Sequence, residues 1–433
     1  MDKSVFAERR ARVLERLGRA VMVLFAAPAA LRNNDVEHEY RQDSDLYYLT
    51  GFDEPDAVLV LSGVHEERAT LFVRPRDPER EQWDGARAGV DGARGEHGLP
   101  AAYPVSELDA RLPDYLGGAT RLYYRLGRSR AEDDRMLAAI DRTRPRARRG
   151  VDVPSEIVDP ADVLHELRWQ KSEGELALLR RAIEITAEGH VAAMAAARPG
   201  QAEFEVEALL RGAFRRGGSE RMAYAPIVGS GANATVLHYR KNDRTMQEGD
   251  LLLIDAGAEY GYYAADVTRT FPVGGRFSAA QRELYSVVLA AQEASIAAVR
   301  PGATLDEVHA ASVRVLTEGL VALGLLSGPL DDAISSERYR RFYMHRTSHW
   351  LGMDVHDVGR YFLDGRPRPL EPGAVLTVEP GLYIPAIADD LPADYRGIGI
   401  RIEDDVLVTP GGHDVLSAAI PKQVADVEGA CRR

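Results

Sequence analysis

A repeated block near the middle of the chain constrains its fold more than any other feature. Arg198-Pro199-Gly200 recurs 102 residues later as Arg300-Pro301-Gly302, and each copy is followed by Glu-Val at the same offset. Each block closes an Ala-rich helical pattern, over 183–197 and 284–299, because Pro stops a helix and Gly supplies its C-terminal turn. This part of the chain is therefore predicted to contain two related halves, each supplying one part of a shared central site.

In the first half, residues Leu251–Pro272 predict two antiparallel strands joined by a tight turn. With the turn at Tyr260-Gly261, Asp255 and Asp266 lie directly opposite each other. Like charges in that position destabilise a strand pair unless a cation lies between them. The hairpin therefore predicts half of a metal site. The alternative is two solvated carboxylates at opposite strand ends.

The second half places further ligand types at strand ends. Glu379 ends an apolar strand just before Pro-Gly, and Glu403 shares one face of a strand with Arg401 at period two. His345 and His349 have the i, i+4 spacing of a zinc helix, but Arg346 stands where that motif has Glu.

Four buried carboxylates without counter-charge would cost several kcal/mol each. Two divalent cations would offset this cost, held by Asp255, Asp266, His349, Glu379 and Glu403. An oxygen-rich set with one imidazole favours Mn²⁺, while Co²⁺ or Zn²⁺ remain possible. Such a pair predicts hydrolysis by a hydroxide that bridges the two metals. His238, His345 and His356 would donate hydrogen bonds to the reacting groups, although each of them alone is more often a structural histidine.

The N-terminal part predicts an α/β domain. Tyr40–Phe52 is rich in aromatic and polar residues, and we interpret it as a packed strand edge near an interface or cleft. Trp83, in a Gly-rich polar loop, either anchors that loop or caps a pocket. The strands are predicted at 21–25, 57–62, 69–73 and 121–124, and the helices at 4–17, 107–116 and 131–143.

A chain of 433 residues is too long for one ordinary core, and we place a domain boundary near Arg168–Ser172, giving domains 1–170 and 171–433. The net charge of −13 argues against nucleic acid as a partner. Ala20–Leu31 resembles a secretory signal, but acidic residues dilute the basic region before it, and we predict a buried strand after an amphipathic helix instead. No apolar run is long enough for a membrane span. The single cysteine, Cys431, fits a reducing compartment, so a cytoplasmic location is expected.

The five ligand positions, in this order and context, resemble those of the pita-bread metallopeptidases, and the likeness is greatest to the aminopeptidase P branch. It covers nearly the whole chain, including segments 40–51, 76–89, 229–239 and 395–405. The resemblance implies an α/β N-terminal domain followed by an α+β pita-bread catalytic domain with an internal pseudo-two-fold repeat. It also implies a homo-oligomer, a dimer or a tetramer, because Trp83 is similar to an aromatic residue that reaches into a neighbouring subunit's site.

The resemblance also implies a role for each site residue. Asp255 would bind one metal, Asp266 and Glu403 would bridge both, and His349 and Glu379 would hold the second. Glu379 would also handle the proton of the attacking water. The substrate would be bound by His238, His356, Tyr383 and Trp83, and His345 and Arg401 would complete the catalytic set.

The implied activity is metal-dependent removal of the first residue from peptides with proline in second place. Prolidase, which takes only dipeptides, is the closest alternative. Methionine aminopeptidase would not need the N-terminal domain, and creatinase would not need the metals. A metal-free binding module on the same scaffold is the alternative from another class, but such proteins have typically lost ligands.

Overall fold

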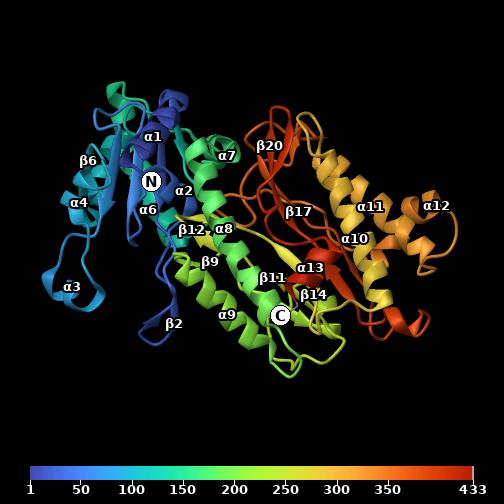
Figure 1. The fold of residues 1–433 in the computed structure, drawn as a ribbon. Coiled ribbons are helices and arrows are strands. Elements are labelled where there is room, and N and C mark those ends of the chain that lie inside the picture. The colour runs from blue at the N-terminus through green and yellow to red at the C-terminus, as the bar shows by residue number, and fades with distance from the viewer. Residues whose placement is uncertain (432–433) are drawn as a thin grey trace. The chain divides into compact units, whose positions relative to one another are not determined.

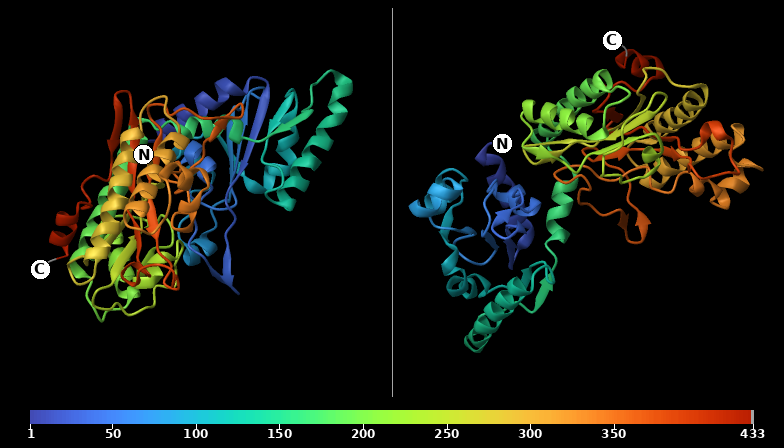
Figure 2. Two further views of the ribbon diagram at one scale, coloured as in Figure 1. Left: turned by 90° about the vertical axis from the view of Figure 1, so that its right-hand side faces the viewer. Right: turned by 90° about the horizontal axis from the view of Figure 1, so that it is seen from below.

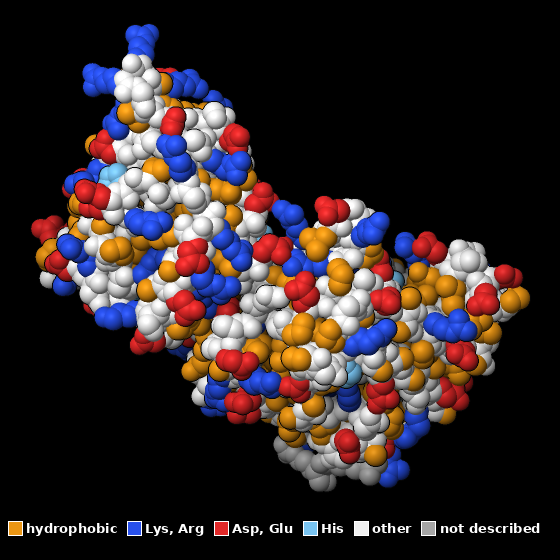
Figure 3. Space-filling model, turned by 90° about the horizontal axis from the view of Figure 1, so that it is seen from above, with side chains coloured by type: hydrophobic (Ala, Val, Ile, Leu, Met, Phe, Trp, Pro, Cys, Tyr) orange, Lys and Arg blue, Asp and Glu red, His pale blue; other side chains and the backbone are white. Residues whose placement is uncertain are grey.

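The structure is a computed structural model, and it describes residues 1–431. The chain divides between Leu167 and Arg168 into two compact units (Figure 1). No helix in the described residues is sufficiently long and apolar to cross a membrane. On the face seen in Figure 3, acidic and basic side chains are interspersed rather than gathered by sign.

The first unit is built on a mixed six-stranded sheet in the order β6-β5-β4-β1-β7-β8 (Figure 1). Its central strand, β1 (Ala20–Phe25), is buried at every position, which confirms the strand interpretation of this apolar run. Val21 and Val23 pack on one face with helices α5 (Leu108–Leu116) and α6 (Arg130–Thr143), and helices α1 (Lys3–Leu17) and α2 (Ser44–Thr50) cover the other. A strand covered on both faces is a continuous apolar run, as this one is. The other strands are β4 (Val58–Ser62), β5 (Ala69–Val73), β6 (Ala101–Pro104), β7 (Arg121–Tyr123) and β8 (Glu156–Val158).

The helices of the first unit confirm the predicted amphipathic segments. The main ones are α1 (Lys3–Leu17), α5 (Leu108–Leu116), α6 (Arg130–Thr143) and α7 (Ala161–Trp169), whose last residues enter the second unit; the short ones are α2 (Ser44–Thr50), α3 (Pro78–Asp84) and α4 (Gly89–Gly95). A small hairpin of β2 (Leu31–Asn33) and β3 (Val36–Glu37) completes the unit.

Two local predictions for this unit were wrong. The segment expected as a strand edge contains helix α2, because the Asp43 carboxylate caps the amides of Asp45 and Leu46 and Gly51, with φ of 61°, ends the helix. Trp83 lies in helix α3 rather than in a loop, because Asp77 caps that helix and Pro78 occupies its first turn.

The second unit contains the two predicted halves, each opened by an antiparallel helix pair, green and gold in Figures 1 and 2. Helix α8 (Glu173–Ala196) packs on α9 (Glu203–Arg216), and α10 (Ala279–Ala298) packs on α11 (Leu305–Ala322). The repeated Pro-Gly block forms the same link in both. Gly200 and Gly302 have φ of 90° and 83°. Their amides donate to the backbone carbonyls of Met246 and Leu370 respectively. The two halves therefore repeat a supersecondary unit.

Short antiparallel strands follow each helix pair. In the first half they are β9 (Arg221–Met222), β10 (Ile227–Ser230), β11 (Leu251–Asp255), β12 (Ala258–Tyr260), β13 (Tyr263–Ala264) and β14 (Thr268–Pro272). In the second half they are β15 (Phe362–Leu363), β16 (Arg366–Pro367), β17 (Val375–Val378), β18 (Gly381–Tyr383), β19 (Gly399–Arg401), β20 (Asp404–Thr409) and β21 (Gly412–Val415). Helices α12 (Leu330–Ser335) and α13 (Val424–Ala430) lie outside the repeat.

Candidate metal centre

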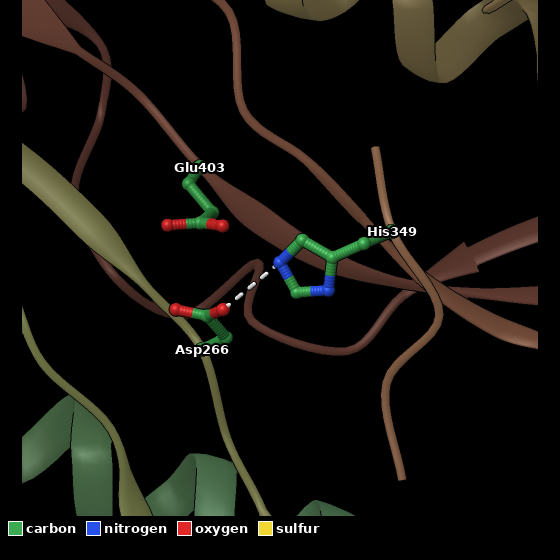
Figure 4. A group of neighbouring side chains, drawn as sticks. All are labelled: Asp266, His349 and Glu403. Carbon is green, nitrogen blue, oxygen red and sulfur yellow. Dashed lines mark ion pairs between the residues drawn. The ribbon is translucent and has the colours of Figure 1, made fainter. Parts of the chain in front are cut away.

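Strand ends from both halves bring acidic side chains to one place. Asp255 ends β11, Glu379 directly follows β17, and Glu403 directly precedes β20. Ligand atoms of Asp266, His349 and Glu403 all lie within 4.8 Å of one another (Figure 4). The exposed fractions of Asp266 and Glu403 are only 5% and 2%, so both carboxylates face the interior.

The register expected for the Asp hairpin was wrong by two residues. The turn is Gly261-Tyr262, with φ of 55° and 71°, and Asp255 therefore pairs with Thr268 instead of Asp266. The two carboxylates nevertheless come together at the hydroxyl of Tyr224, which lies 2.6 Å from an oxygen of each. A hydroxyl has one proton, so it can donate to only one of these carboxylates at a time.

The second half joins this hairpin through Glu403. Its amide donates to the carbonyl of Thr268 at 3.1 Å, and its carboxylate accepts a 2.6 Å hydrogen bond from the hydroxyl of the same residue. Pairing of Val378 with Asp404 brings Glu379 and Glu403 to the same end of their strand pair. The carboxylates of the two halves thus meet where strands of the two halves touch.

His349 turns one ring nitrogen toward the carboxylates. Its Nδ1 lies 3.0 Å from the carbonyl of Trp350, and because a carbonyl can only accept, Nδ1 carries the proton. Its Nε2 lies 3.2 Å from Asp266 and 3.7 Å from Glu379. Burial lowers the pKa of His349, but the hydrogen bond and charge of Asp266 overcome it and raise the pKa to about 9.

The crowding of negative charge in this cluster fits a metal-binding site. Burial raises the pKa of Asp255, of Glu379 to about 8, and of Glu403 well above its ordinary range. The neighbouring carboxylates add to the rise at Glu379 and Glu403, while Arg401 opposes it. Carboxylates crowded in this way are stabilised by cations of higher charge than one guanidinium. The donor set of oxygens and one imidazole nitrogen suits a hard or borderline metal.

A chain of hydrogen bonds supports the acidic cluster from one side. Arg401 donates to Asp255 at 2.6 Å and to the hydroxyl of Tyr383 at 2.8 Å. The oxygen of Tyr383 lies 2.9 Å from Nε2 of His345, whose Nδ1 faces the carbonyl of Arg346 at 2.7 Å. Nδ1 of His345 is therefore protonated and Nε2 accepts from Tyr383. Burial lowers the pKa of His345 to about 3, which keeps the ring neutral.

The other two histidines predicted for the site, His238 and His356, are exposed. The ring of His356 packs edge-on against that of His349, with centroids 4.4 Å apart, and its pKa is lowered by burial and by His349. His238 follows the 3₁₀ turn Gly231–Thr235 and lies near enough to His345 and His356 to contribute to the lowered pKa of each. Trp83 belongs to the first unit, where 85% of it is exposed.

Three side chains of the centre were not predicted from the sequence. They are Tyr224, the hydroxyl of Thr268, and Asp405, whose carboxylate accepts from the amide of Asp266 at 3.2 Å. Strand periodicity could have indicated Asp405, two residues after Glu403. Tyr224 lies outside every acidic motif and gives no sequence signal.

The comparisons with known proteins place the chain in a family. Residues 177–410 match the model described as metallopeptidase family M24, and residues 6–123 match the aminopeptidase P N-terminal domain. The chain belongs to metallopeptidase family M24, and it is a hydrolase of the metallopeptidase class. The family resemblance seen in the sequence is confirmed.

Individual relatives cover nearly the whole chain. The chain is 45% identical to an Xaa-Pro aminopeptidase of Escherichia coli, over 99% of this chain and 97% of the relative, and 43% identical to one of Haemophilus influenzae, over the same shares. Among solved structures, Pseudomonas aeruginosa aminopeptidase PepP matches with a TM-score of 0.97 and 48% identity, covering 100% of this chain and 98% of that one. A zinc-substituted E. coli aminopeptidase P in complex with product matches with a TM-score of 0.95 and 44% identity, over the same shares. The predicted fold class, an α/β domain followed by a pita-bread catalytic domain, is confirmed.

Proposed function

We propose that this chain is a metal-dependent aminopeptidase that releases the first residue from peptides with proline in second place. One observation carries the proposal: a buried group of Asp266, His349 and Glu403, joined by Asp255 and Glu379, lies in a chain alignable over 99% of its length with an Xaa-Pro aminopeptidase. The five side chains come from both halves of the repeat.

In this proposal the five residues hold two divalent cations, for which we favour Mn²⁺ over Co²⁺ or Zn²⁺. Asp255 would bind one ion, His349 and Glu379 would bind the other, and Asp266 and Glu403 would contribute to both. Bound ions of this kind lower the pKa of water and polarise a carbonyl oxygen. Tyr224, Thr268 and Arg401 orient the carboxylates through the hydrogen bonds described above.

The protein's own groups would then move the proton. Glu379 takes a proton from the attacking water at its carboxylate and passes it to the proline nitrogen as the amide bond breaks. His238 and His356 donate hydrogen bonds to the substrate on either side of that bond. We assign His345 a supporting role, because both of its ring nitrogens are engaged, one of them with Tyr383.

The substrate class has a physical basis. An Xaa-Pro bond is a tertiary amide without N–H, so a peptidase that reads its substrate as an extended strand loses one anchor there. A dedicated site must instead hold the ring and serve its nitrogen, and it must also bind the free N-terminus. His238 and His356 can contact the proline ring and its nitrogen, and the acidic cluster can bind the free N-terminus.

Peptide length tests the proposal against its alternative, prolidase. The Mn²⁺-loaded protein should cleave an Xaa-Pro-Yaa-Zaa tetrapeptide after its first residue, measured by release of the free amino acid. A tetrapeptide with alanine in place of proline is the control and should be cleaved far more slowly. Cleavage of the Xaa-Pro dipeptide with no action on the tetrapeptide would identify a prolidase.

We also propose a cytoplasmic homo-oligomer, dimeric or tetrameric. Trp83 supports the oligomer, because 85% of the residue is exposed and its side chain is free to reach a neighbouring subunit. Light scattering gives the mass in solution. Trp83→Ala should reduce activity in an oligomer that shares its sites, whereas a fully active monomeric wild type would contradict the proposal.

A further inference from the structure

We propose that Glu203 is a positioning residue for His238, and that it acts by fixing the loop that carries this histidine. The inference deepens the proposed function and rests on it, because it takes His238 to contact the substrate. Glu203 lies at the start of helix α9 and is completely buried.

The carboxylate of Glu203 collects hydrogen bonds from four positions spread over residues 230–244. Its Oε1 accepts from the amide and hydroxyl of Ser230 at 2.6 and 2.7 Å, and from the side-chain amide of Asn233 at 3.2 Å. Its Oε2 accepts from the hydroxyl of Tyr239 at 2.8 Å and from the amide of Arg244 at 3.0 Å. The two oxygens thus hold the two ends of one loop together.

Helix α9 does not need this carboxylate as a cap. The capping interaction of the helix comes from Glu205, whose side chain accepts from the amide of Ala202 at 2.7 Å. All the side-chain hydrogen bonds of Glu203 described above go to the loop instead. Burying the Glu203 carboxylate costs free energy unless all of its hydrogen-bond donors stay in place. It therefore favours the single loop conformation that supplies them.

The ring of His238 depends on that conformation. In the part of the chain that the structure describes, 1–431, no hydrogen bond holds the ring, and the residue is exposed. Its position therefore follows from the backbone, which Tyr239 anchors one residue later. Tyr239 also closes a tight turn, since its amide donates to Val236 at 3.2 Å.

The loop is also seated against the metal centre. Gly399 of β19 lies so close to the 3₁₀ turn of the loop that a Cβ there would stand 2.1 Å from the carbonyl of Ala234. The same strand carries Arg401, which holds Asp255. Release of the loop would therefore change the distance between His238 and the reacting groups, while the five metal-ligating side chains keep their positions.

A double-mutant cycle tests the inference, with Glu203→Gln, His238→Ala and their combination in the Mn²⁺-loaded full-length protein. An amide at position 203 turns N–H groups toward donors, so half of the loop contacts are lost. We expect Glu203→Gln to lower kcat on an Xaa-Pro-Yaa-Zaa peptide about 10- to 100-fold, because a displacement near 1 Å costs that much. In the His238→Ala background the same change should cost less than about 2-fold, because the residue through which it acts is gone.

Glu205→Gln is the matched control, on the same helix turn but without loop contacts, and should leave kcat within about 2-fold in both backgrounds. Hydrogen exchange of amides 231–244 gives a second readout and should accelerate in Glu203→Gln only. If Glu203→Gln does not fold, Tyr239→Phe removes one of the same hydrogen bonds, and its smaller loss should likewise vanish with His238→Ala.

Full additivity of Glu203→Gln and His238→Ala in an active protein, or unchanged exchange of 231–244 with wild-type turnover, would overturn this inference alone. A wild-type protein that cleaves no Xaa-Pro peptide would overturn both this inference and the function on which it rests.

Discussion

Tyr224 lies between the carboxylate at the end of β11 and that of Asp266, just before β14, and it has one proton to share between them. Substituting it should disturb the ligands directly. We expect Tyr224→Phe to weaken metal binding about 10- to 100-fold, as the loss of an orienting hydrogen bond does at other metal sites. Competition with a chelator measures this affinity. Tyr395→Phe, which removes a surface hydroxyl in the same unit, should bind metal like the wild type.

His190 makes the stability of the second unit depend on pH. It is fully buried beside Ala256, and burial lowers its pKa from 6.5 to about 4. Between these two values the unfolded chain binds a proton that the folded chain does not, so this contribution to stability is complete above pH 6.5 and is lost as pH falls toward 4. The whole difference is on the order of 3 kcal/mol.

Urea unfolding between pH 4 and 7.5 tests this. His190→Gln keeps a donor for the Ala256 carbonyl. Its free energy of unfolding should fall less steeply with decreasing pH than that of the wild type, and the difference in slope should correspond to about one bound proton. An unchanged slope would mean that His190 binds its proton equally in the folded and the unfolded protein, so that burial does not lower its pKa.

Some residues of the centre are predictable from the sequence and others are not. Asp255, Asp266, His349, Glu379 and Glu403 could be selected because unpaired buried charge demands a counter-ion. Tyr224 and Glu203 could not, since a tyrosine and a helix-terminal glutamate are ordinary residues until the chain folds around them.

At the scale of elements, a buried ion cluster fixes the segment that carries His356. Asp357 accepts from Arg168 at 2.7 Å and from Lys171 at 3.0 Å, and the side chains of all three are 3% exposed or less. Removing one charge leaves the others unpaired, so Asp357→Asn should lower the free energy of unfolding by about 3 kcal/mol or more.

Denaturant unfolding measures that loss. The control is Asp354→Asn, since Asp354 also accepts from Arg168, at 2.8 Å, but its side chain is 34% exposed. The solvent screens this pair, and its loss should cost about 1 kcal/mol or less. Equal losses of unfolding free energy in the two variants would contradict the conclusion that burial makes the Asp357 ion pairs stronger than the Asp354 pair.

Elements with a strong periodic signal were predicted within one or two residues, as for β5 and α6. The errors have local causes. Tyr262 occupies a positive-φ position that favours glycine, so the hairpin register could not be obtained from the position of Gly261 alone. The aromatic content of Tyr40–Phe52 favoured a strand and concealed the capping Asp43 of helix α2.

At the scale of the whole molecule, the repeat explains why the centre lies where it does. Asp255 is the last residue of β11 in the first half, Glu379 directly follows β17 in the second, and Glu403 is held by Thr268 across the junction. Neither half holds a complete ligand set. The repeat was visible in the sequence as two Pro-Gly blocks, whereas the junction required the three-dimensional arrangement of the strands.

The account depends on these five side chains holding the cations that the reaction needs. Its most direct test is metal analysis of the chelator-treated protein before and after addition of Mn²⁺, with cleavage of an Xaa-Pro-Yaa-Zaa peptide followed in parallel. We predict activity that disappears with the metal and returns with two ions per chain, and that Asp266→Ala and Glu403→Ala stay folded but neither retain both ions nor turn over substrate. Full activity in the metal-free protein, or in either variant, would contradict the account.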